Sequence, residues 1–557
     1  MPPRTEHRCL IERHRDATIE GLIDRIHVPA CILLFIGAAC LFIPSPGIQS
    51  DEALFGTAWY EPAGLSYETG LFGRHIPLML MSYLGALKAW LYAPIFAIWR
   101  PSALSVRLPA ILAGAATIWL FYRLVQKVSG ERAARIACAL LACDAMFVLT
   151  TTLDWGPVAL QHLLTTGGAL AMVSYAQTGT LKLLALGSFL FGLGTWDKAL
   201  FLWMLSGLIA AAVVVCPKEL WRLFSLRSAA VALGCYCLGA APLIAYNVRH
   251  PLETFRSNTG YSAGDVPGRV LLLKNTLDGS RLFSYIARDE PPPAPRSPEG
   301  IVERASVKLS EVAGRRQSWL PFACLAALAL APWLRSGRVG SFCLIAFAVA
   351  WAQMLFAAKG AGGGVHHVVL LWPLPHLFVA DALARASERL RLTRVAAWAA
   401  AALVAGSSLL VINEYKATLV RNGGGKVWTD AIWPLSESLG RLRAETVFVI
   451  DWGMLDQLIL LHKGSLPLRV ASDPLSKTDF SAGDRAVVAG WLRIPGGVFV
   501  SHTDDNEEFQ GVNARLRQIA GEEGCEQQIL ERIPDRHGRA MFEVWRFESR
   551  GLAALAP

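Results

Sequence analysis

The chain has 557 residues, of which 53% are hydrophobic and 17% are charged, with a mean hydropathy of +0.39. Soluble proteins carry roughly 25% charged residues, so this composition excludes an ordinary soluble protein. Apolar runs of about 20 residues recur, the length of a helix that crosses the hydrocarbon layer of a membrane. The net charge of +9 does not indicate nucleic-acid binding, because most of the excess lies in short loops between apolar runs.

The N-terminal segment 1–27 is polar, basic and predicted to be cytoplasmic, because basic residues gather on the cytoplasmic side of membrane spans. The same rule orients the rest of the chain through the basic clusters Arg123, Lys127, Arg132, Arg135, Lys182, Lys218, Arg222, Arg227, Arg335, Arg338, Arg385, Arg389, Arg391 and Arg394. Eleven spans are then predicted, at residues 28–44, 104–126, 133–152, 156–176, 181–197, 199–216, 228–246, 319–334, 339–358, 366–384 and 394–413.

One further apolar segment does not fit this threading. If the run from His75 to Trp99 crossed the membrane, every later basic cluster would face outward. Its aromatic residues and Lys88 are typical of a helix in the membrane interface. We therefore predict a juxtamembrane helix over 76–99, within a first outer loop at 45–103, and keep a twelfth span as the alternative.

The chain is predicted to have two folded parts. Residues 28–415 form the transmembrane part, which includes a long outer loop at 247–318. Residues 416–439 form a linker that is flexible at its three glycines, and residues 440–557 alternate short β-rich and helical runs. The fold class is thus a polytopic α-helical membrane protein, with about 11 spans plus juxtamembrane helices, and a C-terminal extracytoplasmic α/β domain.

Charged residues gather beside the apolar runs on the outer side of this threading. A charge at mid-membrane costs on the order of 3 kcal/mol, so recurring charges at one side need a reason. The adjacent carboxylates Asp51 and Glu52 come directly after the first span. The same side collects Arg74, His75, Arg107, Asp154, Asp197, Lys198, Asn247, Arg249, His250, His366 and His367.

These residue types suit transfer of a group from a phosphate. A carboxylate can act as general base when burial and neighbours tune its pKa, and Arg and Lys bind phosphate oxygens. No nucleotide-binding loop, nucleophile elbow or zinc-protease motif is present in the sequence. His366 and His367 with the acidic pair leave a divalent metal open, since imidazole and carboxylate are common ligands. The alternative is that both histidines bind phosphate or line the cavity mouth.

Several motifs resemble bacterial GT-C glycosyltransferases of family 39, related to protein O-mannosyltransferases and to the aminoarabinose transferase of lipid A. The resemblance covers roughly residues 28–415, and His366-His367 stands where that family has Arg-Tyr, while Asp197 is extra. The motifs are Asp51-Glu52, His75-Ile76-Pro77-Leu78, Ser105-Val106-Arg107-Leu108-Pro109-Ala110, Leu153-Asp154-Trp155, Gly192-Leu193-Gly194-Thr195-Trp196-Asp197-Lys198 and His367 through Pro375.

The resemblance implies a polyprenyl-phosphate-linked sugar donor and direct displacement with inversion at the outer face of a bacterial inner membrane. Asp51 would take the proton of the acceptor hydroxyl, and Glu52 would orient Asp51 or a cation. The acceptor, a protein, lipid or glycan, stays open. The implied contacts to donor, lipid phosphate or acceptor are Arg74, His75, Arg107, Asp154, Lys198, Arg256, Lys274, His366 and His367.

Other functions and purely structural roles remain as alternatives. A transporter or flippase of lipid-linked sugars would also carry intramembrane charges. A ligase of whole glycans and a receptor for lipid-linked sugars are further alternatives. Structurally, the acidic pair and Asp154 could cap helices, Arg107 could snorkel, Lys198 could pair with Asp197, and Arg256 and Lys274 could be solvated.

Overall fold

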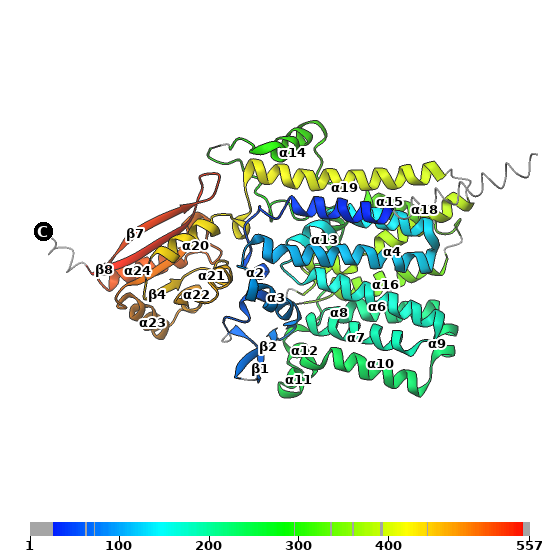
Figure 1. Ribbon diagram of the computed structural model, residues 1–557. Helices are drawn as coiled ribbons and strands as arrows, with labels where there is room; N and C mark the ends of the chain where they lie inside the picture. The colour runs from blue at the N-terminus through cyan, green and yellow to red at the C-terminus, as the bar shows by residue number, and fades with distance from the viewer. Residues whose placement is uncertain are drawn as a thin grey trace, which may run out of the picture.

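The computed structural model describes residues 26–61, 64–71, 73–294, 296–334, 337–358, 361–389, 394–442 and 444–549. A bundle of helices carries a C-terminal α/β domain at one end, which we call the domain end (Figure 1). The N-terminal segment up to residue 25, together with Arg335 and Arg391, lies outside the described residues.

The bundle helices run side by side along its long axis (Figure 1). An apolar helix at Ile26–Cys40 opens the chain. The helices that follow in the bundle are α4 (Ala103–Ala142), α5 (Ala145–Thr152), α6 (Val158–Thr178), α7 (Leu181–Asp197), α8 (Phe201–Val215), α9 (Pro217–Leu223), α10 (Leu226–Gly239), α11 (Ala241–Arg249), α15 (Leu320–Leu330), α16 (Arg338–Leu355), α17 (Val365–Val368), α18 (Leu374–Arg389) and α19 (Arg394–Asn422).

Helix α4 turns back on itself at Gly130. The φ and ψ angles of this residue are 82° and 177°, a conformation that glycine adopts without the strain a Cβ would cause. Gly114, in the arm before Gly130, packs against Thr151 of α5, which follows the arm after Gly130. The two arms of α4 are therefore antiparallel. The first arm corresponds to the predicted span 104–126, and the second arm together with α5 corresponds to the predicted span 133–152.

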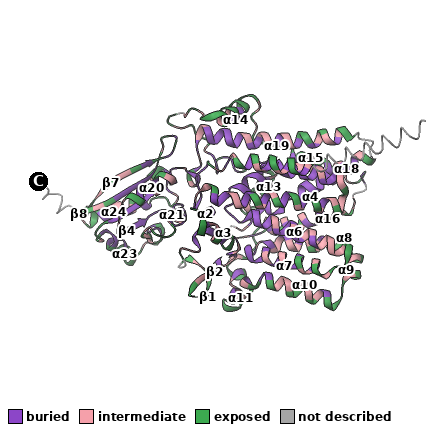
Figure 2. Ribbon diagram, in the orientation of Figure 1, coloured by how far each residue is buried: buried purple, intermediate pink, exposed green. Residues whose placement is uncertain are grey.

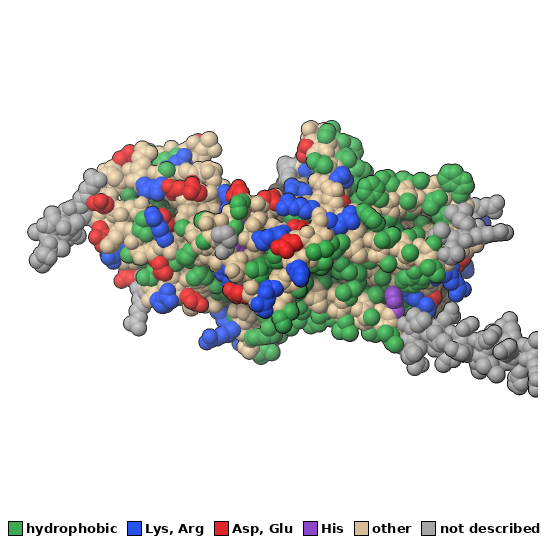
Figure 3. All heavy atoms as spheres, turned by 90° about the horizontal axis from the view of Figure 1, so that it is seen from above, with side chains coloured by type: hydrophobic (Ala, Val, Ile, Leu, Met, Phe, Trp, Pro, Cys, Tyr) green, Lys and Arg blue, Asp and Glu red, His purple; other side chains and the backbone are tan. Residues whose placement is uncertain are grey.

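Every predicted span is largely helical, but the spans 133–152 and 228–246 are each divided between two helices, and the number of spans remains a prediction. Among the described residues, four helices are long and apolar enough to cross a membrane, and six if each of two bent pairs forms one span. Large apolar side chains point outward along the bundle, as for Leu33 and Phe322, which are 68% and 70% exposed. Figure 3 shows the bundle surface as mostly hydrophobic and the α/β domain as rich in charge. Such a surface suits contact with lipid.

The first half of the segment predicted as a juxtamembrane helix is not helical. The strands β1 (Tyr67–Leu71), β2 (Arg74–Met81) and β3 (Leu84–Gly85) form an antiparallel sheet, and only α3 (Leu87–Ile98) follows the prediction. This sheet region is hydrogen-bonded to the C-terminal end of α7 and to the residues that follow it. Trp196 Nε1–H donates to Leu78 O at 2.8 Å, and Ala199 N–H donates to Tyr83 O at 2.9 Å. These long-range partners override the helical pattern of the sequence.

The long loop at 247–318 contains three helices, α12 (Glu253–Asn258), α13 (Val266–Leu277) and α14 (Gly300–Ala313). The Gly423–Gly425 segment, predicted to be a flexible linker, is held by this loop. Gly425 N–H donates to Ile286 O at 2.9 Å, and Arg288 N–H donates to Gly423 O at 3.1 Å. The preceding helix α19 runs to Asn422, past the predicted end of the last span at 413.

The C-terminal domain has a five-stranded sheet in the order β5-β4-β6-β8-β7. Strand β4 pairs in parallel with β5 and β6, whereas β8 pairs antiparallel with β6 and β7. The strands are β4 (Thr446–Val449), β5 (Leu468–Val470), β6 (Gly497–His502), β7 (Cys525–Pro534) and β8 (Ala540–Ser549).

Helices cover both faces of this sheet, and its core is buried on both sides (Figure 2). One apolar cluster joins β4, β6 and β8 to α20 (Ile432–Arg441) and α21 (Leu455–Leu461). The other joins the opposite face to α22 (Ser472–Ser476), α23 (Ala482–Leu492) and α24 (Val512–Glu522). Helix α21 also contributes Leu460 to a cluster with Phe55 and Phe96, so the domain packs directly on the first outer loop.

Candidate active site

The short helix α2 (Ser50–Thr57) places the acidic pair at the domain end of the bundle. Gln49 forms its N-cap through a capping box, in which the Gln49 side chain accepts from Glu52 N–H at 3.1 Å. Acidic residues in a first helical turn are favoured by the free N–H groups there. Asp51 and Glu52 nevertheless point into different environments, since Glu52 is 1% exposed and Asp51 is half-buried.

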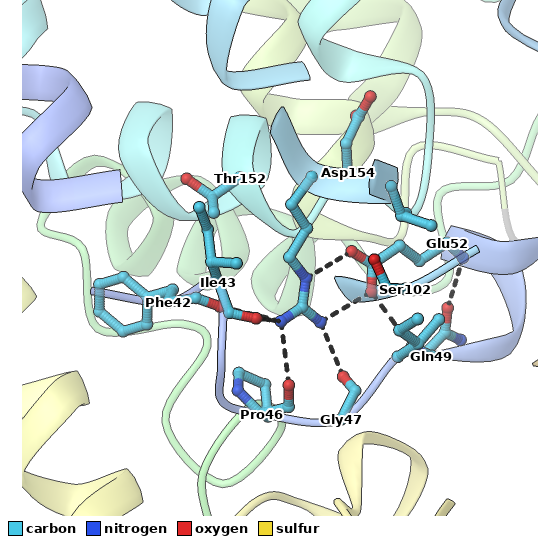
Figure 4. Close-up of polar contacts among 12 residues, drawn as sticks. Phe42, Ile43, Pro46, Gly47, Gln49, Glu52, Ser102, Thr152 and Asp154 are labelled. Carbon is cyan, nitrogen blue, oxygen red and sulfur yellow. Dashed lines mark hydrogen bonds and ion pairs between the residues drawn. The ribbon is translucent and has the colours of Figure 1, made fainter. Parts of the chain in front are cut away.

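Glu52 forms a buried ion pair with Arg107 on α4. Arg107 Nε and Nη2 donate to the two carboxylate oxygens at 2.7 and 2.9 Å. Figure 4 shows this carboxylate and four backbone carbonyls turned toward one guanidinium. The carbonyls belong to Phe42, Ile43, Pro46 and Gly47, at 2.8 to 2.9 Å.

The hydrogen bonds of Arg107 leave no N–H group free for the lipid phosphate that the resemblance implied for it. A guanidinium has five N–H groups, and those of Arg107 are all used by Glu52 and the four carbonyls. Its side chain is fully buried, at 0% exposure. Arg107 and Glu52 therefore fasten the first outer loop to α4 and hold α2 in place.

Asp154 forms a second buried pair, with Lys88 on α3. The Lys88 ammonium lies 2.9 Å from Asp154 Oδ2 and donates to the Asp154 carbonyl at 2.5 Å. The other carboxylate oxygen of Asp154 accepts from Val158 N–H at 2.7 Å and so caps α6. Asp154 thus both caps a helix and pairs with a cation, two roles that the sequence had left as alternatives.

Lys198 lies between α7 and α8, and it is 2% exposed. Its ammonium makes no hydrogen bond or ion pair within the part of the chain that the structure describes. The neighbouring Asp197 accepts instead from Gln161 Nε2 at 2.8 Å, so the predicted alternative of an Asp197–Lys198 ion pair is wrong. Burial lowers the pKa of Lys198 to about 8, against the nearby carboxylates of Asp197, Asp154 and Asp51, which raise it.

Asp51 interacts electrostatically with Lys198. Burial raises the pKa of its carboxyl group above the ordinary 3.8, while the Gln49 side chain and the positive charge of Lys198 lower it. Asp51 also acts electrostatically on Tyr83 of the hairpin and on Tyr285 of the long loop. A carboxylate that is half-buried and has a cation nearby is the arrangement expected of a general base.

The two histidines His366 and His367 lie on the short helix α17. His366 accepts from Trp155 Nε1–H at 3.0 Å, and its ring centroid lies 4.0 Å from that of His367. Both histidines interact electrostatically with Lys198, and His367 does so with Arg269 of α13. Arg269 donates weakly to Ala357 O at 3.4 Å, while its Nη1 is buried without a partner among the described residues.

Four other predicted contacts are not brought to this cluster. His75 pairs with Glu68 at 3.1 Å in the β1–β2 hairpin, where Arg74 is exposed. The exposed ammonium of Lys274 pairs with Asp278 at 3.0 Å, and Arg256 is exposed on α12. None of these four residues lies among the buried groups around Lys198, and their predicted contacts to donor or acceptor remain predictions.

Sequence reasoning missed Lys88 and Arg269. Lys88 was interpreted as an interfacial lysine, although a lysine inside an apolar run of 25 residues can equally mark a buried ion pair. Arg269 shares its loop with ten other Lys and Arg residues, and nothing in the sequence distinguishes it from them. No group of three or more His, Cys, Asp or Glu suited to a metal ion occurs within the described ranges.

Comparison with known proteins relates the chain to membrane glycosyltransferases. Residues 85–246 match the family model described as dolichyl-phosphate-mannose-protein mannosyltransferase. This range includes Lys88, Arg107, Asp154 and Lys198 but not Asp51 and Glu52. No curated protein matches the chain in sequence.

Among solved structures, ArnT from Cupriavidus metallidurans bound to undecaprenyl phosphate is 12% identical, with a TM-score of 0.55, covering 93% of this chain and 97% of ArnT. ArnT in the apo state is likewise 12% identical, with a TM-score of 0.55 and coverages of 95% and 98%. AglB, an oligosaccharyltransferase from Archaeoglobus fulgidus, is 14% identical over 86% of this chain and 70% of its own, with a TM-score of 0.49. The chain therefore has the fold of ArnT and is related to the protein mannosyltransferases, which confirms the resemblance seen in the sequence.

Proposed function

We propose that this protein is a glycosyltransferase that moves a sugar from a polyprenyl-phosphate donor to an acceptor hydroxyl, with inversion. The active site is the cluster around Asp51 and Lys198 at the domain end of the bundle. That end faces away from the cytoplasm, at the outer face of a bacterial inner membrane. The acceptor is a hydroxyl of a protein, lipid or glycan.

The reaction is a single displacement. Asp51 takes the proton of the acceptor hydroxyl, whose oxygen forms a bond to the anomeric carbon of the sugar. The bond between that carbon and the phosphate oxygen breaks, and its electron pair leaves with the polyprenyl phosphate. Attack on the face opposite the leaving group inverts the anomeric configuration.

The observation that carries the proposal is the buried ammonium of Lys198, which has no hydrogen-bond or ion-pair partner among the described residues and which interacts electrostatically with Asp51. A buried charge without a partner is costly, so the position is best explained by a ligand that supplies the missing negative charge. A phosphate that gains charge as it leaves is such a ligand, since Lys binds it as a point charge. Arg269 is a second donor for it, because its Nη1 also lacks a partner among the described residues.

The remaining members of the cluster position these groups. Lys88 and Asp154 neutralise one another, and Asp154 fixes the start of α6. His366 and His367 line the side of the cluster toward Arg269, where they can donate to phosphate oxygens. The proposal includes no resident cofactor, and an assay in EDTA tests the divalent metal that the histidines had left open.

Support also comes from the relatives. ArnT shares the fold over nearly the whole chain and has been crystallised with undecaprenyl phosphate. The matched family is described by a lipid-phosphate-linked mannose donor. Both favour a glycosyltransferase over the transporter or flippase that remained as an alternative.

The test is a transfer assay with purified protein and a panel of radiolabelled undecaprenyl-phosphate sugars. Wild-type protein should release undecaprenyl phosphate from one donor, and Asp51→Asn should bind that donor without turning it over. Asp473→Asn, an exposed carboxylate of α22, is the matched control and should keep wild-type activity. Failure of the wild-type protein to bind any donor would overturn the proposal and favour the transporter.

A further inference from the structure

The C-terminal domain reaches the acidic pair through α21. Gln457 Nε2–H donates to Ile48 O at 3.2 Å, just before α2. Leu460 packs on α2 so closely that a Cβ at Gly56 would lie 2.6 Å from its Cδ1 atom. Lys463, just beyond α21, donates to Phe96 O on α3 at 2.6 Å.

The most direct of these contacts lies one residue from Asp51. Ser50 Oγ–H donates to Asp456 Oδ2 at 2.5 Å, a contact between residues 406 positions apart in the sequence. Ser50 is 1% exposed, so its hydroxyl is shielded from solvent, whereas Asp456 is half-buried. The C-terminal domain therefore holds the residue that precedes the proposed general base.

Helix α2 needs such support because it has eight residues. An isolated helix shorter than about 12 residues is marginal, so packing rather than propensity must fix its position. One side of α2 is fixed to the bundle by Glu52 and Arg107. Further contacts to α2 come from α21, which belongs to the C-terminal domain.

We propose that α21 is a positioning element for the transfer reaction, and that Asp456 is a positioning residue that acts on Asp51 through the side chain of Ser50. The inference rests on the proposed function, since it assigns a role in setting the same general base. Its physical basis is that a misplacement of about 1 Å between a base and its proton can cost on the order of 100-fold in rate.

The experiment compares four variants of the full-length protein in the transfer assay: Asp456→Ala, Asp456→Asn, Ser50→Ala and the Asp456→Ala/Ser50→Ala pair. Asp456→Ala and Ser50→Ala should each lower kcat about 10- to 100-fold, with the KM for donor unchanged. The double variant should lose no more than either single one, because both remove the same bond. Asp456→Asn should restore most of kcat, since its amide oxygen can still accept from Ser50. The control Asp473→Asn lies in the same domain, away from α2.

The outcomes separate this inference from the proposed function. A wild-type protein without transfer would count against the proposed function itself. An active wild type with unchanged kcat in Asp456→Ala, or with additive losses in the double variant, would overturn the inference alone. Loss of donor binding in Asp456→Ala would also overturn it, because Asp456 would then belong to the donor site. A fall in the thermal unfolding temperature of Asp456→Ala, with kcat per folded molecule unchanged, would show that the Asp456–Ser50 contact stabilises the fold without positioning Asp51, and would overturn the inference.

Discussion

Asp51 and Glu52 are neighbours in the sequence with the same chemistry, yet the fold uses them in opposite ways. Glu52 meets a guanidinium whose N–H groups are all bonded, in a pair closed to solvent. Asp51 interacts electrostatically with Lys198, whose ammonium has no bonded partner within the described part of the chain. The comparison shows that a buried charged side chain is a candidate ligand-binding group only where some of its hydrogen-bonding groups have no partner in the protein. A fully hydrogen-bonded ion pair has no free donor or acceptor for a ligand.

The largest effect is expected for Asp51→Asn. General-base catalysis contributes on the order of 100- to 10,000-fold, and an amide cannot take the proton of the acceptor. We expect kcat to fall by that factor, while thermal unfolding in detergent stays within a few degrees of wild type. Equal losses of activity and of folded protein would contradict the contrast between the two carboxylates.

Glu52→Gln should produce the reverse pattern. Removing one partner of a buried ion pair leaves the other charge uncompensated and costs about 3–5 kcal/mol. The guanidinium of Arg107 would keep four carbonyls but lose its counter-charge. Thermal unfolding monitored by fluorescence should show the loss, with the turnover of the remaining folded protein lowered less than in Asp51→Asn. Wild-type stability in Glu52→Gln would show that the pair is not structural.

Lys198→Met tests the role of the buried ammonium that has no hydrogen-bond partner among the described residues. Removing one group that stabilises developing charge typically costs about 100-fold or more in kcat. The variant should fold at least as well as wild type, because it removes an unpaired buried charge. Donor binding measured with labelled undecaprenyl phosphate should weaken as well. Retention of both binding and turnover would mean that the phosphate lies elsewhere.

The pH dependence of kcat/KM sharpens the same point. Transfer needs Asp51 ionised and Lys198 protonated. Burial raises the pKa of Asp51 above 3.8, so activity should rise with pH through a value above that of an ordinary aspartate. Burial lowers the pKa of Lys198 to about 8, so activity should fall as pH rises through that value. The alkaline fall should disappear in the residual activity of Lys198→Met, and its persistence would assign it to another group.

The sequence predicted the helical bundle, the α/β domain and the carboxylate pair, because each follows from local composition and periodicity. It misjudged the segment 76–86, whose apolar pattern suits a helix but whose strands hydrogen-bond to Tyr67–Leu71 and to the chain near Ala199. Such partners lie far away in the sequence, so no local pattern reveals them.

The sequence predicted the types of charged residue at the site, but it could not predict which of them are hydrogen-bonded to one another. Arg107 and Lys198 both follow the family resemblance at the ends of apolar runs, and only the fold shows that one is saturated and the other is not. Lys88 was passed over because a lysine near aromatic residues has a common interfacial explanation. The contact of Asp456 with Ser50 joins two predicted domains, and neither pattern points to the other.

The smallest effect is expected for Lys274→Ala, the basic residue of the long loop that the sequence had offered as a phosphate ligand. Its ammonium is largely exposed and pairs with Asp278 at 3.0 Å, and exposed pairs contribute about 0–1 kcal/mol. We expect kcat/KM to change less than about twofold, against a large loss in Arg269→Ala on the same helix, whose Nη1 is buried without a partner among the described residues. The same assay run at low and high salt should leave this ranking unchanged, because screening acts on the exposed ammonium and hardly on the buried guanidinium. A reversed ranking would place the lipid phosphate on the exposed face of α13 and would remove the unsaturated cluster from the reaction.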